Sequence, residues 1–273
     1  MLALLPPPGP MPTPLQALVL GAVQGLSELL PISSSAHLFL VPTLLGWPYA
    51  GVAFDVALHG GTLVALVAGF WGDWWALARD TFAPDAALRA SARDLWAKLV
   101  VATIPGAIAG KLLGDLEDRL RSVPLQATLL FVFGLLLWLA DRLSPPGRDE
   151  RAPRWGQAIT VGLSQALALV PGVSRSGITI TAGRATGLSR VAAARFSFLL
   201  AAPITLGAVL LKLKDLPHDL PLPTLAIGVL GAAAFGILAI RFLMSFLRHA
   251  GLGVFFAYRA LLALALVIWI VRR

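Results

Sequence analysis

The sequence predicts an all-α integral membrane protein, with six transmembrane helices and two re-entrant helical hairpins in an inverted-topology repeat. Composition is the first reason. Of the 273 residues, 58% are hydrophobic and 13% are charged, whereas soluble domains are about 45–50% apolar and about 25% charged. The other two reasons are that the apolar residues form long runs, and that one broken apolar pattern occurs in each half of the chain. We therefore expect most of this chain to be surrounded by membrane lipid.

Charge and residue usage narrow the function. The chain has no cysteine, which excludes disulfides and thiolate metal sites, and its four histidines disfavour a His-rich zinc site. The net charge of +8 could indicate nucleic acid, anionic lipid or cytoplasmic loops. Because the charges fall in short gaps between apolar runs, we expect loops that contact membrane lipids and no nucleic-acid partner.

Six apolar runs are long enough to cross a bilayer, which takes about 20 residues in a helix. The longest polar stretch between them divides the chain near its middle. We therefore expect a single membrane domain, 1–273, with repeat 1 at about 15–143 and repeat 2 at about 154–271. The six runs lie near Val52–Trp71, Leu95–Gly114, Leu125–Ala140, Ala192–Leu211, Leu222–Leu247 and Gly253–Val271.

Two further apolar segments, 15–46 and 156–187, are each interrupted in the centre by proline and a cluster of serine. Proline disfavours helix at the preceding residue and in the next turn. Each half is then only about 12–16 residues long, too short to cross. Non-helical backbone at membrane depth is tolerated where protein or a water-filled cavity surrounds it. Both segments are therefore predicted to be re-entrant hairpins.

The two segments align at a constant offset of 141 residues, as in Gly21 with Gly162 and Gln24 with Gln165. Each half then holds one hairpin and three spans. Because three is odd, the halves should have opposite orientations, with their broken helices facing each other near the midplane.

Orientation follows from the Lys and Arg counts, because the richer side is usually cytoplasmic. Apart from Arg175 at the hairpin tip, fourteen basic residues lie on one side, within Arg79–Lys98, Arg142–Arg195 and Arg241–Arg259. Both termini are therefore expected outside the cell. The other side, with the termini, has seven: Lys111, Arg119, Arg121, Lys212, Lys214, Arg272 and Arg273.

The first hairpin carries a buried acid. Gln24 and Glu28 are four residues apart, which places both on one helix face. An intramembrane carboxylate is a functional-site hypothesis by default, although a neutral, hydrogen-bonded Glu28 is the alternative. The residues Ser33, Ser34 and Ser35 follow the break. They are suited to capping the returning half-helix, whose N-terminus can also bind an anion.

His37 follows the serine run, and its position three residues past Ser34 favours a catalytic role over a packed polar residue. In the second hairpin, Arg175 lies between Ser174 and Ser176, with Thr179 in reach of the same turn. A guanidinium at this depth needs an anion or a cavity, and its planar fork suits phosphate. An ion pair with Glu28 is the structural alternative, and it does not exclude phosphate binding.

Arg241, in the fifth run, is a second basic candidate for phosphate, unless it snorkels to the nearby cytoplasmic face. Asp55 and His59 in the first run are explained adequately by helix packing contacts. Together, a carboxylate, hydroxyls, an imidazole and a guanidinium suit phosphoryl transfer. Because a carboxylate repels phosphate, we expect a bridging Mg²⁺ or Ca²⁺ with Glu28 as a ligand.

The motifs VQGLSELLPISSSAH and LVPGVSRSGIT resemble the two signatures of the undecaprenyl-pyrophosphate phosphatase family, which is linked to bacitracin resistance. The likeness runs along nearly the whole chain from about residue 15 and includes the Arg241 segment. The family's first motif, Glu or Gln then Glu, matches Gln24 and Glu28. Its essential serine and histidine match Ser34 and His37. Its second motif matches Ser174, Arg175, Ser176 and Thr179.

The resemblance implies hydrolysis of undecaprenyl pyrophosphate to the monophosphate, which recycles the carrier lipid for cell-wall polymers. It also implies the bacterial inner membrane, Mg²⁺ or Ca²⁺ dependence and a site open to the outer side. Gln24 departs from the glutamate of many members, so it is expected to orient or to ligate weakly. Ser34 is the expected nucleophile with His37 as its base, and direct attack by His37 is the alternative.

Competing functions share this plan. Inverted repeats with broken helices also occur in transporters, so a lipid-phosphate flippase is the second hypothesis. An ion channel with the hairpin tips as a filter fits less well, because a filter has no use for Ser34, His37 and Arg175. Release of phosphate from a prenyl pyrophosphate separates these hypotheses. A homodimer is compatible with the sequence but is not specified by it.

Overall fold

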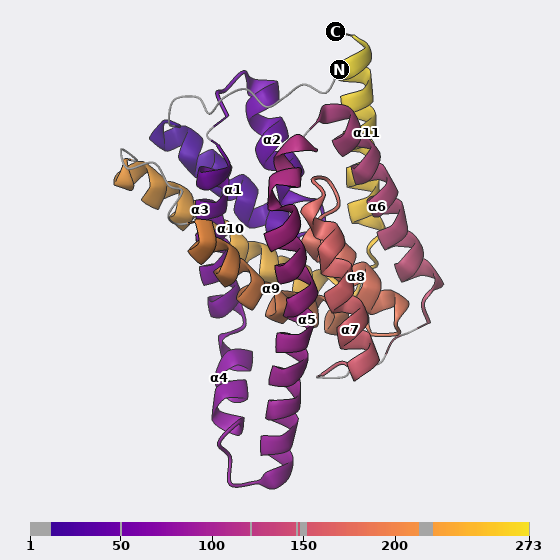
Figure 1. The fold of residues 1–273 in the computed structure, drawn as a ribbon. Coiled ribbons are helices and arrows are strands. Elements are labelled where there is room, and N and C mark those ends of the chain that lie inside the picture. Colours follow the sequence, from indigo (N-terminus) through magenta and orange to yellow (C-terminus); the bar gives the residue numbers. More distant parts are fainter. Residues whose placement is uncertain are drawn as a thin grey trace.

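The computed structural model describes residues 12–49, 51–120, 122–145, 147, 152–212 and 221–272, and within these ranges its regular structure is entirely helical. Figure 1 shows the half-helix α8 within the helical bundle and the half-helix α2 toward its upper end. In chain order the elements are α1 (Pro14–Leu29), α2 (Ser34–Leu45), α3 (Val52–Gly69), α4 (Trp71–Asp80), α5 (Ala86–Arg119), α6 (Val123–Leu143), α7 (Trp155–Ser164), η1 (Gln165–Leu169), α8 (Arg175–Ala185), α9 (Arg190–Lys212), α10 (Leu222–Phe246) and α11 (Gly253–Val271).

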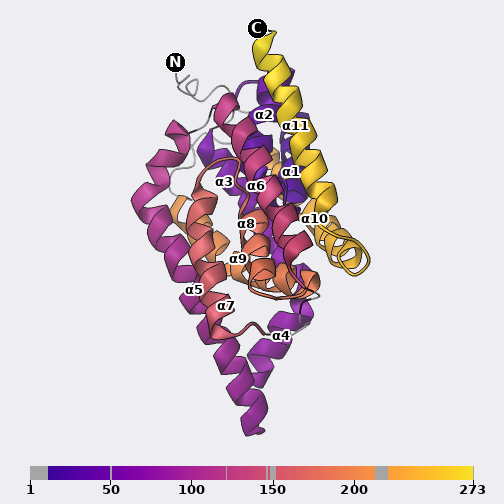
Figure 2. The same cartoon turned by 90° about the vertical axis from the view of Figure 1, so that its right-hand side faces the viewer.

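Among the described residues, five helices are long and apolar enough to cross a membrane: part of α5, then α6, α9, α10 and α11. The first predicted span corresponds to α3, which ends at Gly69. The chain bends there by 66° into α4, and the two together count as a sixth candidate span. The structure therefore confirms a multi-pass all-α protein with five or six candidate spans. The turn between α4 and α5 projects at the opposite end of the molecule from the end of α11 (Figures 1 and 2).

Both predicted breaks are present. Helix α1 ends at Leu29 before Pro31, and η1 ends at Leu169 before Pro171. Each returning half-helix is preceded by a serine with a positive φ, 78° at Ser33 and 76° at Ser174. These serines are related by the same offset of 141 residues that aligns the two motifs. The tips therefore share a backbone conformation, and the opposite orientation of the two halves stays a prediction.

Small residues bring α1 close to α10. Gly25 faces Gly236, and a methyl group at Gly25 would come within 2.7 Å of the Gly236 backbone nitrogen. Gly21 lies equally close to the backbone of Gly228. Small residues let helix backbones approach where lipid supplies no hydrophobic drive between helices. This contact buries the last turn of α1, which carries Glu28.

One basic residue counted for orientation is completely buried. Arg259 is on α11 and is fully buried. Five others counted there, Arg121, Arg148, Arg151, Lys214 and Arg273, lie outside the described residues. The predicted orientation rests on the remaining loop charges and stays a prediction.

We predict that both termini face the outside of the cell, because the loops of the opposite side carry most of the basic residues. A protease site fused after Arg273 should be cut in intact spheroplasts. A matching site inserted in the turn between α4 and α5 should be protected there and cut in inside-out vesicles. The reverse pattern of protection would contradict this orientation.

Candidate active site

A pocket with a volume of about 210 Å³ lies where the two hairpin tips meet. Its polar lining comes from six elements: the end of α1, the starts of α2 and α8, the helix α3, η1, and α9. Apolar residues of α9 and neighbouring helices complete the wall. The polar lining residues are Glu28, Ser34, Ser35, Asp55, His59, Gln165, Ser174, Arg175 and Thr205.

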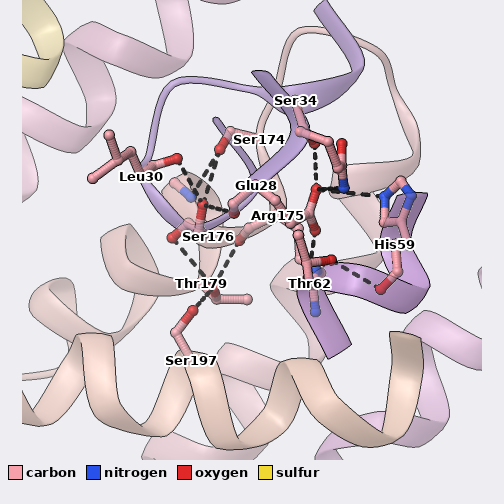
Figure 3. Close-up of polar contacts among 12 residues, drawn as sticks. Glu28, Leu30, Ser34, His59, Thr62, Ser174, Arg175, Ser176, Thr179 and Ser197 are labelled. Carbon is pink, nitrogen blue, oxygen red and sulfur yellow. Dashed lines mark hydrogen bonds and ion pairs between the residues drawn. The ribbon is translucent and has the colours of Figure 1, made fainter. Parts of the chain in front are cut away.

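The Glu28 carboxylate is the centre of this site and is only 6% exposed (Figure 3). One carboxylate oxygen, Oε1, accepts a hydrogen bond of 2.5 Å from Nη2 of Arg175. The other, Oε2, accepts hydrogen bonds from the Ser34 hydroxyl and, at 3.3 Å, from the Gln24 amide. The Nε2 atom of His59 lies 3.4 Å from the same oxygen. The buried Glu28 charge is therefore paired with Arg175 and hydrogen-bonded by Ser34 and Gln24.

Arg175 retains an unused donor. Its Nη2 atom is bound to Glu28, but its Nη1 atom is buried and has no hydrogen-bond partner among the described residues. An unsatisfied buried donor costs about 1–3 kcal/mol. A phosphate oxygen in the adjoining pocket would satisfy Nη1 with a charge-assisted hydrogen bond. The guanidinium is thus placed to hold Glu28 and an anion together.

Two helix N-termini open onto the pocket. Ser34 and Arg175 are the first residues of α2 and α8, and both line it. The Ser174 hydroxyl caps α8 by accepting from the Gly177 amide at 3.1 Å. The Ser33 hydroxyl makes no such cap and instead lies 3.3 Å from the Ser35 hydroxyl. Free N–H groups and aligned peptide dipoles favour an anion at such ends.

Two of the predicted binding residues support the tips from behind. The Ser176 hydroxyl donates to the carbonyl oxygens of Glu28, at 2.9 Å, and Leu30, at 3.2 Å. The Thr179 hydroxyl lies 2.6 Å from the Ser197 hydroxyl on α9 and donates to the Arg175 carbonyl at 2.7 Å. These contacts fix α8 against the end of α1 and against α9. Neither residue lines the pocket.

The structure places two other predicted residues away from the pocket. The His37 ring stacks on Tyr258, with Nε2 2.6 Å from the tyrosine hydroxyl and Nδ1 2.7 Å from the Ser33 carbonyl. Both ring nitrogens are therefore engaged outside the pocket lining. Arg241 is exposed on α10 and is not a lining residue either. The structure thus brings Glu28, Ser34 and Arg175 together without His37 or Arg241.

His59 and Asp55 are the site residues that the sequence interpretation attributed to helix packing. Both line the pocket. The His59 Nδ1 atom lies 2.8 Å from the Asp55 carbonyl, and the Asp55 carboxylate accepts a hydrogen bond of 2.8 Å from Tyr49. Their spacing of four residues inside an apolar run was the available signal, because it places two ionisable groups on one helix face.

The pocket contains oxygen ligands that suit the expected divalent cation. Two carboxylates, Glu28 and Asp55, line the pocket, and their oxygens suit Mg²⁺ or Ca²⁺. Among the described residues, however, no group of three or more His, Asp or Glu side chains is placed to hold a metal. Mg²⁺ is often held by one or two carboxylates plus substrate phosphates. The residues therefore fit a cation that enters together with a phosphate ligand.

The buried pair allows a test of its own. Removing one partner of a buried ion pair leaves an uncompensated charge, at a cost of about 3–5 kcal/mol. Glu28→Gln and Arg175→Met should therefore each lower the thermal unfolding midpoint in detergent more than the double variant does. The same cycle on Arg79 and Asp80, an exposed pair, should show no such pattern. A double variant no more stable than the weaker single variant would show that the pair is not coupled.

Known proteins are similar to this chain along nearly its whole length. Residues 17–265 match the family described as bacitracin resistance protein BacA. The undecaprenyl-diphosphatase of Moorella thermoacetica is 51% identical over 257 residues, which cover 93% of this chain and 97% of that protein. The undecaprenyl-diphosphatase of Pelotomaculum thermopropionicum is 47% identical over 262 residues, covering 94% of this chain and 96% of that protein.

Proposed function

The chain belongs to the bacitracin resistance protein BacA family, and on that premise we propose that it hydrolyses undecaprenyl pyrophosphate to undecaprenyl phosphate and inorganic phosphate. It is then a membrane hydrolase acting on a phosphoric anhydride, and its product is the carrier lipid for cell-wall polymers. The assignment of this activity to the pocket rests on one observation. A hydroxyl, a carboxylate and a guanidinium meet there at two helix N-termini, and the Nη1 atom of the guanidinium has no partner among the described residues.

The pocket suits the polar head of such a lipid. Arg175 and the N-termini of α2 and α8 supply positive potential for the pyrophosphate. Leu38, Ile204 and Ala208 line the same pocket and are apolar, as the first part of a prenyl chain requires. We also propose that the pocket opens to the outer side of the inner membrane, as the predicted orientation supports.

We propose Ser34 as the nucleophile and Glu28 as the group that receives its proton. The Ser34 hydroxyl already donates to Glu28 Oε2. As Ser34 Oγ attacks the terminal phosphorus, the bond to the bridging oxygen breaks and undecaprenyl phosphate leaves. The proton moves from Ser34 to Glu28. Water then attacks the phosphoserine, the proton on Glu28 returns to Ser34 Oγ, and inorganic phosphate leaves as dihydrogen phosphate with both protons of that water.

The other side chains orient these groups. The Gln24 amide and His59 Nε2 face Glu28 Oε2 and keep the carboxylate turned toward Ser34. Arg175 binds the terminal phosphate and stabilises the charge that develops on it. His37 was the base expected from sequence. Its contacts with Tyr258 and Ser33 favour Glu28 for that role, and leave His37 to position the start of α2.

We predict that Ser34→Ala abolishes turnover while lipid binding persists, because the hydroxyl contributes to the transition state far more than to ground-state binding. Arg175→Lys should also fail, since an ammonium keeps the charge but loses the fork. His37→Ala should be less severe than either. Single-turnover phosphate release and trapping of a phosphoenzyme measure these effects. A phosphohistidine, or near wild-type turnover in Ser34→Ala, would contradict the assignment.

The same phosphate-release assay tests the alternative function of a lipid flippase. A flippase would move labelled undecaprenyl pyrophosphate between leaflets of a proteoliposome without releasing phosphate. Phosphate release by purified wild-type protein, lost in Ser34→Ala, supports the hydrolase. Lipid movement that persists unchanged in Ser34→Ala, with no release by the wild type, would favour the transporter instead.

We further propose that Mg²⁺ or Ca²⁺ binds together with the substrate, with Glu28 as its protein ligand. When bound, the cation would neutralise phosphate charge. The support is that two carboxylates, Glu28 and Asp55, line the pocket, and that one or two carboxylates commonly hold Mg²⁺ together with substrate phosphates.

We predict that calorimetry detects Mg²⁺ binding only when methylenediphosphonate, which is not hydrolysed, is present. Glu28→Gln should weaken this joint binding, and Asp80→Asn, on the exposed surface of α4, should not. Tight Mg²⁺ binding without the diphosphonate would show that a complete metal site exists before substrate arrives. Equal binding by Glu28→Gln would remove Glu28 from the ligand set.

A further inference from the structure

A second buried arginine lies behind the pocket. Arg259, on α11, is 0% exposed, and its guanidinium donates to backbone carbonyl oxygens. Among the described residues, its hydrogen-bond partners include no carboxylate. The contacts are Leu130 at 2.9 Å, Leu129 at 3.3 Å, Pro31 at 3.4 Å, Gly172 at 2.8 Å and Val173 at 3.2 Å.

Three of these carbonyls belong to the two hairpin tips. Pro31 lies in the first tip, just before Ser33, and Gly172 and Val173 lie in the second tip, just before Ser174. Ser33 and Ser174 have positive φ angles, a conformation that costs about 1–3 kcal/mol for a residue with a side chain and persists only where the surroundings fix it. A single guanidinium therefore joins the two strained turns from which α2 and α8 begin.

Neighbouring helices leave room for this side chain. A methyl group at Gly134, on α6, would come within 3.2–3.3 Å of the Cβ, Cδ and Nε atoms of Arg259, and these are its three nearest atoms. A methyl group at Gly177, on α8, would come within 3.1 Å of Nη1. The preceding residue, Tyr258, contacts His37 on α2. This part of α11 thus contacts the start of both half-helices.

We propose that Arg259 is a positioning residue of the phosphatase, which holds the N-termini of α2 and α8 in register so that Ser34 and Arg175 face the same phosphate. It acts through the carbonyls of the tips and does not touch the substrate. This inference rests on the proposed function. A buried cation is costly unless its surroundings compensate it, and the ring of carbonyls supplies that compensation. Only a planar fork can reach both tips and α6 at once.

The first test replaces the planar guanidinium of Arg259. Arg259→Lys keeps a charge but cannot span the carbonyls, and Arg259→Met removes the charge. Both should lower kcat by about 10²-fold, since a misplacement of about 1 Å can cost that much. Arg272→Lys, on the exposed end of the same helix, should retain wild-type kcat. In Arg259→Ala, added guanidinium at non-denaturing concentration should restore part of the turnover, and methylammonium at equal ionic strength should not.

A second test leaves Arg259 in place, so the inference can still be tested if the Arg259 variants fail to fold. Gly134→Ala should displace the guanidinium and lower kcat, whereas Gly110→Ala, which has no neighbour within 4 Å, should not. Near wild-type kcat in Arg259→Met or in Gly134→Ala would overturn the proposal, as would equal rescue by guanidinium and methylammonium. If wild-type protein releases no phosphate from undecaprenyl pyrophosphate, the proposed function itself fails, and that outcome is distinct from these.

Discussion

The ion pair between Glu28 and Arg175 is the contact on which the rest of this structure depends. Each partner comes from a different half of the chain, and each lies in a segment too short to cross a membrane. Neither charge is tolerable alone at that depth, because an isolated buried ion costs several kcal/mol. The two tips must therefore meet. The close contact of Gly25 with Gly236 and the hydrogen bonds of Ser176 to the end of α1 hold them there.

The same electrostatics prepares the pocket for an anion. Glu28 and Asp55 contribute negative charge, and Arg175 and the buried guanidinium of Arg259 contribute positive charge. The two helix N-termini add positive potential beyond these charges, which favours a pyrophosphate in apolar surroundings. Because Arg175 keeps Nη1 unpartnered among the described residues, a phosphate oxygen can bind without first breaking the pair with Glu28.

Sequence was sufficient where the signal is local. Proline and serine placed both breaks correctly, and the depth of Glu28 and Arg175 in apolar sequence indicated a site built from both hairpins. It was insufficient where the signal is tertiary. His37 and His59 are both histidines near polar neighbours, and only packing decides that His59 faces Glu28 while His37 faces Tyr258. Arg259 lies near the start of an apolar run, where a loop charge is equally plausible, and its carbonyl partners come from three distant segments.

The two hairpin tips share features of backbone conformation but differ in their side chains. Ser33 and Ser174 share a positive φ, and so do Gly46 and Gly187, at the same spacing of 141 residues. At that spacing Ser34 corresponds to Arg175, and Glu28 to Leu169. One tip therefore presents a hydroxyl beside its acceptor, and the other presents a cation that pairs with the carboxylate of the first tip. Two identical tips would give two nucleophiles without a phosphate clamp, or two clamps without a nucleophile. In the proposed mechanism, the divergence of the two motifs thus lets one tip hold a phosphate while the other attacks it.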